Sequence, residues 1–152
     1  MRRRDILKSI GAGAAAATLI AKPAVAQNAP VIKWRCPGSF PPSADALVGG
    51  GTMFAKMVAE ATDNRFTIQT FLPGEIVPAL SVLDAVQNGT VEVGYTASYF
   101  YIGKDFTFGL GTSIPFGPNR LLQNAWLFEA GGLALLHDFY KPYKVHYIPG
   151  GN

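Results

Sequence analysis

After residue 27, short strand-like segments alternate with segments that have a helical pattern of apolar residues. Residues 31–36, 66–71 and 91–96 are rich in β-branched and aromatic residues, and Pro and Gly follow the first two. Residues 121–139 predict a pair of helical segments, and residues 145–149 predict a last strand. The connections are long enough for the crossover helix that joins parallel strands. The alternation therefore predicts an α/β fold with a parallel sheet.

Two helices are expected between the first three strands. Ser43 is a candidate cap for the first helix, and Asp45 lies in its first turn. The glycine run at residues 49–51 indicates either a bent or late-starting helix, or close packing of its backbone against another element or a ligand. Gly131 and Gly132 interrupt the later helical pair. The predicted buried faces are Phe54, Met57, Val58 and Ala61 in the first helix, and Ala79, Val82, Leu83 and Val86 in the second.

Residues 1–26 have the pattern of an export signal. A basic start precedes an uncharged run at residues 10–21, and Ala24-Val25-Ala26 supplies the small residues at which a signal peptidase cleaves, after Ala26. A helix over the uncharged run would be about 18 Å long, short of the ~30 Å hydrocarbon core, so no stable membrane insertion is expected. The alternative interpretation is a buried N-terminal helix, but Gly and Ala between basic residues make a poor core helix.

The positive charge of the chain belongs to this leader. Thirteen Lys and Arg residues against ten Asp and Glu residues give a formal charge of +3. The leader holds five of the basic residues and one acidic residue, which leaves eight against nine, a formal charge of −1. Neither a net positive charge nor a basic cluster remains after the leader, so the composition excludes a nucleic-acid partner.

The sequence gives little support for catalysis or for a metal site. His137 and His146 lie nine residues apart without a zinc-ligand spacing, and both are interpreted as packing or surface residues. Cys36 is the only cysteine, and we expect a buried strand thiol rather than a nucleophile. Phosphate-binding loops and nucleophile elbows are absent from the sequence. The chain is therefore predicted not to be an enzyme.

Aromatic residues gather where the predicted strands end. Phe40 follows the first strand, Tyr99-Phe100-Tyr101 follows the strand at residues 91–96, and Asn152 follows the last strand. In open parallel sheets, ligands bind at the carboxyl ends of the strands. These loops therefore predict a crevice for a small molecule. The alternative is that the Tyr-Phe-Tyr run packs a short helix onto the sheet.

Four segments carry a resemblance to a known family: residues 32–43 (IKWRCPGSFPPS), 71–86 (FLPGEIVPALSVLDAV), 88–105 (NGTVEVGYTASYFYIGKD) and 148–152 (IPGGN). Together they closely resemble the periplasmic substrate-binding proteins of TRAP transporters, the DctP type, and in particular the branch that handles 2-oxo acids and related organic acids. Arg3 and Arg4 also begin RRDILK, which resembles the twin-arginine export motif R-R-x-F-L-K; a Sec leader with paired arginines is the alternative.

This resemblance implies a two-lobed periplasmic-binding-protein-like fold of the class II type. Residues 27–152 would form the N-terminal lobe and the crossover strand, incomplete at the C-terminus, because family members are about twice as long. Phe40, Tyr99, Phe100 and Tyr101 would line the ligand crevice, with Asn152 at the crossover. An arginine further along the chain would pair with the ligand carboxylate, and a sodium ion beside the ligand would also take its ligands beyond residue 152; no other cofactor is expected.

The resemblance also implies a function. The protein would be exported to the periplasm by the twin-arginine route and capture a carboxylated organic anion, such as a 2-oxo acid or a dicarboxylate. It would deliver that anion to a small and a large TRAP membrane subunit for sodium-coupled uptake. Two alternatives are an exported enzyme whose catalytic residues lie beyond residue 152, and a truncated remnant that binds nothing.

Overall fold

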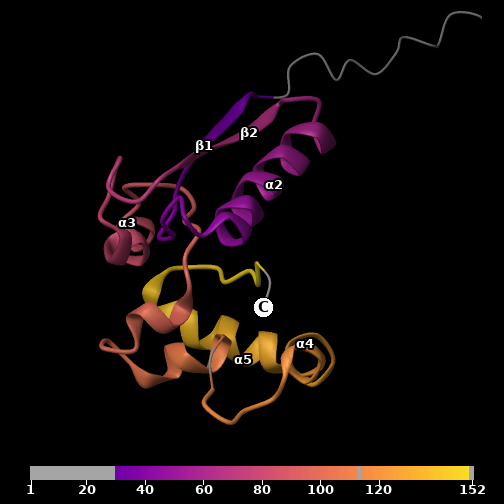
Figure 1. Cartoon of the computed structure of the whole chain (residues 1–152). Helices are drawn as coiled ribbons and strands as arrows, with labels where there is room; N and C mark the ends of the chain where they lie inside the picture. Colours follow the sequence, from indigo (N-terminus) through magenta and orange to yellow (C-terminus); the bar gives the residue numbers. More distant parts are fainter. Residues whose placement is uncertain (1–29, 113, 151–152) are drawn as a thin grey trace, which may run out of the picture. The chain divides into compact units, whose positions relative to one another are not determined.

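The computed structural model describes residues 30–112 and 114–150. The predicted leader, with Arg3, Arg4 and the cleavage position Ala26, lies outside the described residues, and so does Asn152. The elements below carry the labels of Figure 1.

A parallel pair of strands with a crossover helix forms the first half of the described chain. Strand β1 (Ile32–Pro37) pairs with β2 (Phe66–Phe71) in the register Ile32↔Phe66. Helix α2 (Asp45–Ala61) connects the two strands and runs along them (Figure 1). The buried side chains of Cys36, Ala55 and Ile68 form the core between helix and sheet. This arrangement confirms the predicted parallel α/β unit and the buried position of Cys36.

The buried face of α2 differs from the predicted one, of which Val58 alone packs against the core. Gly51 and Ala55 are buried, whereas the side chains of Phe54 and Met57 are 47% and 60% exposed. Small residues face the sheet because the helix lies close to it, and the larger apolar residues are left on the outer side. The predicted cap is also wrong, because Ala44 is the N-cap residue and no side chain caps the helix.

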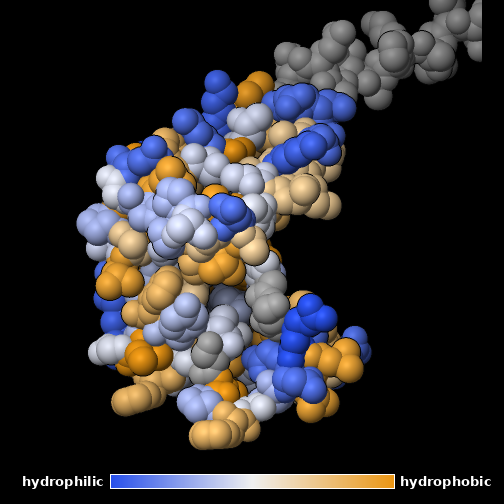
Figure 2. Space-filling model, viewed as in Figure 1, coloured by the Kyte–Doolittle hydropathy of each residue, from blue (hydrophilic) through white to orange (hydrophobic). Residues whose placement is uncertain are grey.

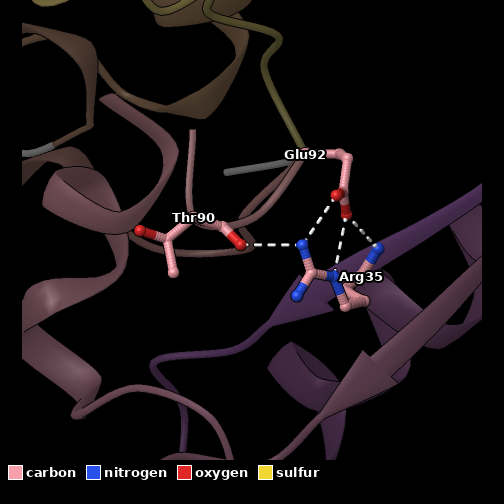
Figure 3. A network of polar contacts seen from close by, with 3 residues as sticks. All are labelled: Arg35, Thr90 and Glu92. Carbon is pink, nitrogen blue, oxygen red and sulfur yellow. Dashed lines mark hydrogen bonds and ion pairs between the residues drawn. The ribbon is translucent and has the colours of Figure 1, made fainter. Parts of the chain in front are cut away.

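The segment at residues 91–96 is not a regular strand. Its backbone pairing is a single parallel bridge between Tyr95 and Gly38, the residue after β1, in which the Tyr95 N–H donates to the Pro37 carbonyl oxygen at 3.0 Å. Towards its start, the Glu92 carboxylate accepts hydrogen bonds from the backbone N–H of Arg35 at 2.8 Å and from the Arg35 guanidinium at 2.7 and 3.2 Å (Figure 3). The same guanidinium donates to the Thr90 carbonyl oxygen at 2.7 Å. A side chain therefore takes the donor that a neighbouring strand would have used.

The second predicted helix is present in a shorter form. A 3₁₀ turn (η1, Ala79–Ser81) leads into α3 (Val82–Gln87), and Gly89 follows it with φ of +70°. Val82 and Leu83 are buried, as predicted. A Cβ on Gly94 would clash with Val82 Cγ1, so a glycine is needed where α3 packs on this segment.

Short helices form the rest of the described chain. They are η2 (Ser98–Tyr101), η3 (Phe106–Gly111), α4 (Arg120–Glu129), α5 (Gly132–Tyr140) and η4 (Lys141–Tyr143). The predicted break in the helical pair is confirmed at Gly131, which has φ of +82°. The predicted strand at residues 145–149 is wrong: this stretch has no regular secondary structure, because it has no strand to pair with in the described ranges.

These short helices surround a second core. It contains the buried residues Leu83, Tyr101, Phe108, Leu127, Leu136 and Tyr140. The Phe108 ring makes edge contacts with Phe139, Tyr140 and Tyr143 at centroid distances of 4.9 to 5.5 Å. Apolar residues also reach the surface, as the orange areas of Figure 2 show. Within the described ranges, the helices are all too short or too polar to cross a membrane.

Candidate functional site

Three of the predicted loops meet at one cavity, here called cavity A, of about 250 Å³. Phe40 comes from the carboxyl end of β1, Tyr99 from η2, and Gly150 from the segment that leads to Asn152. The full lining is Phe40, Leu47, Gly94, Tyr95, Thr96, Ala97, Ser98, Tyr99, Thr112, Tyr147, Ile148 and Gly150.

The aromatic residues of the site pack against one another. Phe40 is almost buried, and its ring centroid lies 6.0 Å from that of Phe100. Phe100 makes an edge contact of 4.6 Å with Tyr99, whose side chain is 39% exposed. Phe40 and Tyr99 therefore line the cavity, while Phe100 supports them from behind.

Tyr101 lies elsewhere, in the second core, with only 3% of its surface exposed. Its hydroxyl oxygen accepts a hydrogen bond from the Leu83 N–H at 3.1 Å and lies 3.1 Å from Thr96 Oγ1. Ser39 Oγ continues this chain of hydroxyl groups, at 2.7 Å from Thr96 Oγ1 and 2.6 Å from the Ala79 carbonyl oxygen. The network ties the loops after β1 and before η2 to α3, so Tyr101 positions the cavity lining without contributing to it.

The Tyr-Phe-Tyr run was expected either to line a crevice or to pack a short helix onto the sheet, and the short helix at residues 98–101 has features of both. In a 3₁₀ helix, residues two apart point in different directions. Tyr101 therefore packs into the core, while Tyr99 faces cavity A.

Tyr95 was missed by the sequence analysis. Its ring makes an edge contact with Phe40 at 5.5 Å. A Cβ on Gly50 would lie 2.5 Å from the Tyr95 hydroxyl oxygen, and one on Gly51 would lie 2.9 Å from Tyr95 Cδ1. The close-packing interpretation of the glycine run is thus confirmed, and the run itself was the signal that a large side chain lies against the helix.

A second cavity, here called cavity B, lies between α2 and the carboxyl ends of β1 and β2 and has a volume of about 250 Å³. The polar groups on it are few: a thiol, two threonine hydroxyls, the Tyr95 hydroxyl and the Glu75 carboxylate, which accepts a hydrogen bond from the Leu72 N–H at 2.6 Å. The full lining is Cys36, Gly38, Phe40, Val48, Gly51, Thr52, Thr70, Phe71, Leu72, Glu75 and Tyr95.

Both cavities are lined without Lys, Arg or His. Burial raises the pKa of the Cys36 thiol to about 11, so the thiol is protonated at neutral pH. Burial also raises the pKa of the Tyr95 hydroxyl, with a smaller contribution from Cys36, so this group stays neutral as well. The linings therefore present apolar surface, hydroxyl groups and one carboxylate.

The two histidines lie together but outside both cavities. The His137 and His146 rings stack at 4.4 Å, and His137 Nε2 lies 2.8 Å from the Tyr147 carbonyl oxygen. This contact joins α5 to the segment that lines cavity A. The part of the chain that the structure describes contains no group of three or more His, Cys, Asp or Glu residues able to hold a metal ion.

Comparisons with known proteins agree on one family. Residues 38–146 match the model of the bacterial extracellular solute-binding proteins of family 7, DctP. A monocarboxylate 2-oxoacid-binding periplasmic protein of Nostoc sp. is 42% identical over 157 residues, which cover the whole of this chain and 43% of that protein. The chain thus spans less than half the length of this relative.

Solved structures of TRAP transporter solute-binding proteins have the same fold over the matched part. The protein of Bordetella bronchiseptica, with calcium and picolinate, is 39% identical with a TM-score of 0.75, over 78% of this chain and 35% of that one. The protein of Colwellia psychrerythraea, with calcium and pyruvate, is 31% identical with a TM-score of 0.76, over 79% and 37%. The protein of Pseudoalteromonas atlantica, with sodium and pyruvate, is 33% identical with a TM-score of 0.76, over 79% and 36%.

Proposed function

Because the chain belongs to family 7 of the bacterial extracellular solute-binding proteins, the DctP family, we propose that it contributes part of the ligand site of a TRAP transporter receptor for a carboxylated organic anion. The observation that carries this proposal is the meeting of Phe40, Tyr99 and the segment at residues 147–150 at cavity A. Three similar proteins have been crystallised with picolinate or pyruvate, which are both small carboxylates.

The chemistry of cavity A suits the uncharged part of such a ligand. Phe40 and Tyr99 offer aromatic surface to a flat 2-oxo acid. The hydroxyls of Thr96 and Ser98 also line the cavity, where they are held by Ser39 Oγ at 2.7 Å and by Thr112 Oγ1 at 3.1 Å, respectively. A carboxylate needs a cationic partner, and the cavity lining has none. We therefore assign that role to an arginine further along the polypeptide, and we place Asn152 beside the ligand at the crossover between two lobes.

A cation beside the ligand would need more than the described residues supply. The similar proteins carry calcium or sodium together with their ligands. Hard cations of this kind take several oxygen ligands, among them carboxylates. Cavity A offers hydroxyl and carbonyl oxygens but no carboxylate, so its lining does not fit such an ion alone.

The remaining parts of the proposal concern export and delivery. We propose that residues 1–26 are a signal peptide read through Arg3 and Arg4 by the twin-arginine route and cleaved after Ala26. The mature protein would then act in the periplasm and pass its ligand to a small and a large TRAP membrane subunit. It would bind and release the acid unchanged, without catalysis.

A chimera tests the proposed site. Residues 31–150 replace the corresponding part of the Bordetella bronchiseptica protein, which supplies the rest of the receptor. We expect the chimera to bind pyruvate or picolinate in calorimetric titrations, and Phe40→Ala and Tyr99→Ala to weaken binding by about tenfold or more, since each removes a ring from the site. A folded chimera that binds no organic acid would refute the proposal and favour a remnant without binding activity.

A further inference from the structure

Cavities A and B are separated by two aromatic rings. Phe40 and Tyr95 are the residues common to both linings. Their ring centroids lie 5.5 Å apart and their planes cross at 67°, so the edge of one ring closes on the face of the other. The pair therefore forms a wall, with a hollow of about 250 Å³ on each side.

The Tyr95 ring is held in this wall from two sides. On one side lie Gly50 and Gly51 of α2, where an added Cβ would come within 3.0 Å of the ring or its hydroxyl. On the other side lies Gly150, where an added Cβ would lie 3.1 Å from Tyr95 Cε2. Gly50 and Gly51 lie about a hundred residues before Gly150 in the sequence. Because none of the three has a side chain, the Tyr95 ring fits between them, in space that a Cβ atom would otherwise take.

Cavity B has the chemistry of a pocket for an apolar group. Val48, Phe71 and Leu72 line it together with the two wall rings. The Cys36 thiol is uncharged at neutral pH. The Glu75 carboxylate on the lining repels a second anionic group, and no basic side chain on that lining compensates for it. The cavity therefore suits a hydrocarbon tail and disfavours a second carboxylate.

We propose that Tyr95 determines the size of acid that the site accepts: its ring confines the ligand to cavity A, and cavity B becomes a subsite for an apolar tail once the ring is removed. This inference rests on the proposed function for its ligand. The wild-type site then accepts only acids that fit within cavity A.

The first test does not depend on ligand binding. Cys36 lines cavity B and is the only cysteine of the chain, so a small thiol reagent reports on access to that cavity. With the full chain and methyl methanethiosulfonate at pH 8, we expect Tyr95→Ala to react about tenfold faster than wild type. Tyr95→Phe is the matched control, since it keeps the ring and loses only the hydroxyl group, and should react at nearly the wild-type rate.

Labelling through global unfolding is separated from labelling through the cavity by adding low concentrations of urea. If Cys36 reacts only when the protein unfolds, its labelling rate rises steeply with urea concentration. If Cys36 reacts in the folded protein because the Tyr95 ring is missing, the rate depends little on urea. Tyr95→Leu, which keeps apolar volume, replaces the alanine variant if that variant does not fold. The inference would be refuted if Cys36 reacted at the same rate in wild type and in the variant without the ring. It would also be refuted if unfolding, measured by the urea dependence, accounted for the whole increase in the labelling rate.

The second test measures preference between acids. The chimera described under the proposed function is titrated with pyruvate and with 4-methyl-2-oxovalerate, which has a longer apolar tail, and amide shifts report the Kd of each. Each buried carbon of the tail is expected to gain about fourfold in affinity. In Tyr95→Ala, the affinity for the longer acid relative to pyruvate should therefore rise by about tenfold or more. Adding Val48→Phe to this variant should cancel the rise, because the larger side chain fills cavity B.

The outcomes separate this inference from the proposed function. If neither acid binds any version of the chimera, the proposed function fails, while the Cys36 rates still decide whether the Tyr95 ring shields cavity B. If both acids bind and their Kd ratio is the same in wild type and in Tyr95→Ala, the proposed function stands and the role of Tyr95 is refuted.

Discussion

Glu92 and Arg35 illustrate how a single pair of side chains changes local structure. The Arg35 guanidinium donates to both carboxylate oxygens of Glu92, and the backbone N–H of Arg35 donates to one of them (Figure 3). The pair is partly exposed to solvent, so its contribution to stability is limited by screening. Its larger consequence is geometric, because it joins β1 to residues 90–92 where a regular strand pairing is missing.

The first prediction concerns acid stability. Hydrogen bonds from Arg35 lower the pKa of Glu92 from 4.5 to about 2. A group whose pKa is lowered by folding stabilises the folded state above its unfolded pKa, and this contribution is lost as the pH falls from about 4.5 to about 2. Glu92→Gln should therefore unfold with a weaker dependence on pH in this window, measured as urea midpoints from pH 6 to pH 2.5. Identical slopes for variant and wild type would contradict the assignment.

At the scale of elements, the glycine run of α2 allows a matched comparison. A Cβ on Gly51 would lie 2.9 Å from Tyr95 Cδ1 and 3.1 Å from Tyr95 Cγ, atoms near the base of the ring that cannot move away easily. A Cβ on Gly49 would meet nothing within 4 Å. The two positions thus differ in packing, although both lie in the same helix.

The second prediction follows from this difference. Gly49→Ala should stabilise the protein by up to about 1 kcal/mol, because alanine is the better helix former. Gly51→Ala should instead destabilise it by about 1 to 3 kcal/mol, because the added methyl group overpacks the contact with Tyr95. Urea unfolding of the two variants measures the difference. A stabilising Gly51→Ala would show that the ring does not lie on the helix.

The sequence patterns predicted which helices and strands form better than they predicted which side of each element is buried. Alternation and breakers identified β1, β2 and α3, and the glycine pair identified the break before α5. The pattern failed at α2, because a helix that lies close to a sheet buries small residues, and Phe54 and Met57 then mark the outer side. It failed at residues 91–96 because the Glu92 side chain, which looks like a solvent-facing residue of a strand, bonds to the neighbouring backbone.

Only part of the candidate site could be predicted from the sequence, because local patterns do not encode the distances between elements. The position of Phe40 and Tyr99 follows from the general geometry of parallel sheets, which brings loops at the carboxyl ends of strands together. The contact of Tyr95 with Gly50 and Gly51 depends on the distance between a helix and a bridge residue, which no local pattern encodes. Tyr101 was placed in the same loop as Tyr99, but the turn of a 3₁₀ helix carries it into the core.

At the scale of the molecule, the residues from Val31 onward form one compact unit with two cores. The core around Phe108 contains the Tyr101 ring, which in turn bonds to the network that holds Thr96 and Ser39. The packing of the short helices and the shape of cavity A are therefore coupled through Tyr101.

The third prediction compares two phenylalanines of η3. Phe108 is 1% exposed at the centre of the second core, whereas Phe106 is 86% exposed. Phe108→Ala should destabilise the protein by about 3 to 5 kcal/mol, because it leaves a large cavity. Phe106→Ala should change the free energy of unfolding by less than about 0.5 kcal/mol. Similar losses in both variants, measured by chemical unfolding, would contradict the assignment of the core.

If cavity A is the ligand-facing part of an organic-acid receptor, pyruvate should perturb the amide NMR signals of the cavity lining in the chimera that supplies the rest of the receptor. We expect saturable shift changes at Phe40, Thr96 to Tyr99, Thr112 and Gly150, and their loss in the Phe40→Ala variant. Shift changes confined to other surfaces, or none at millimolar pyruvate, would contradict it.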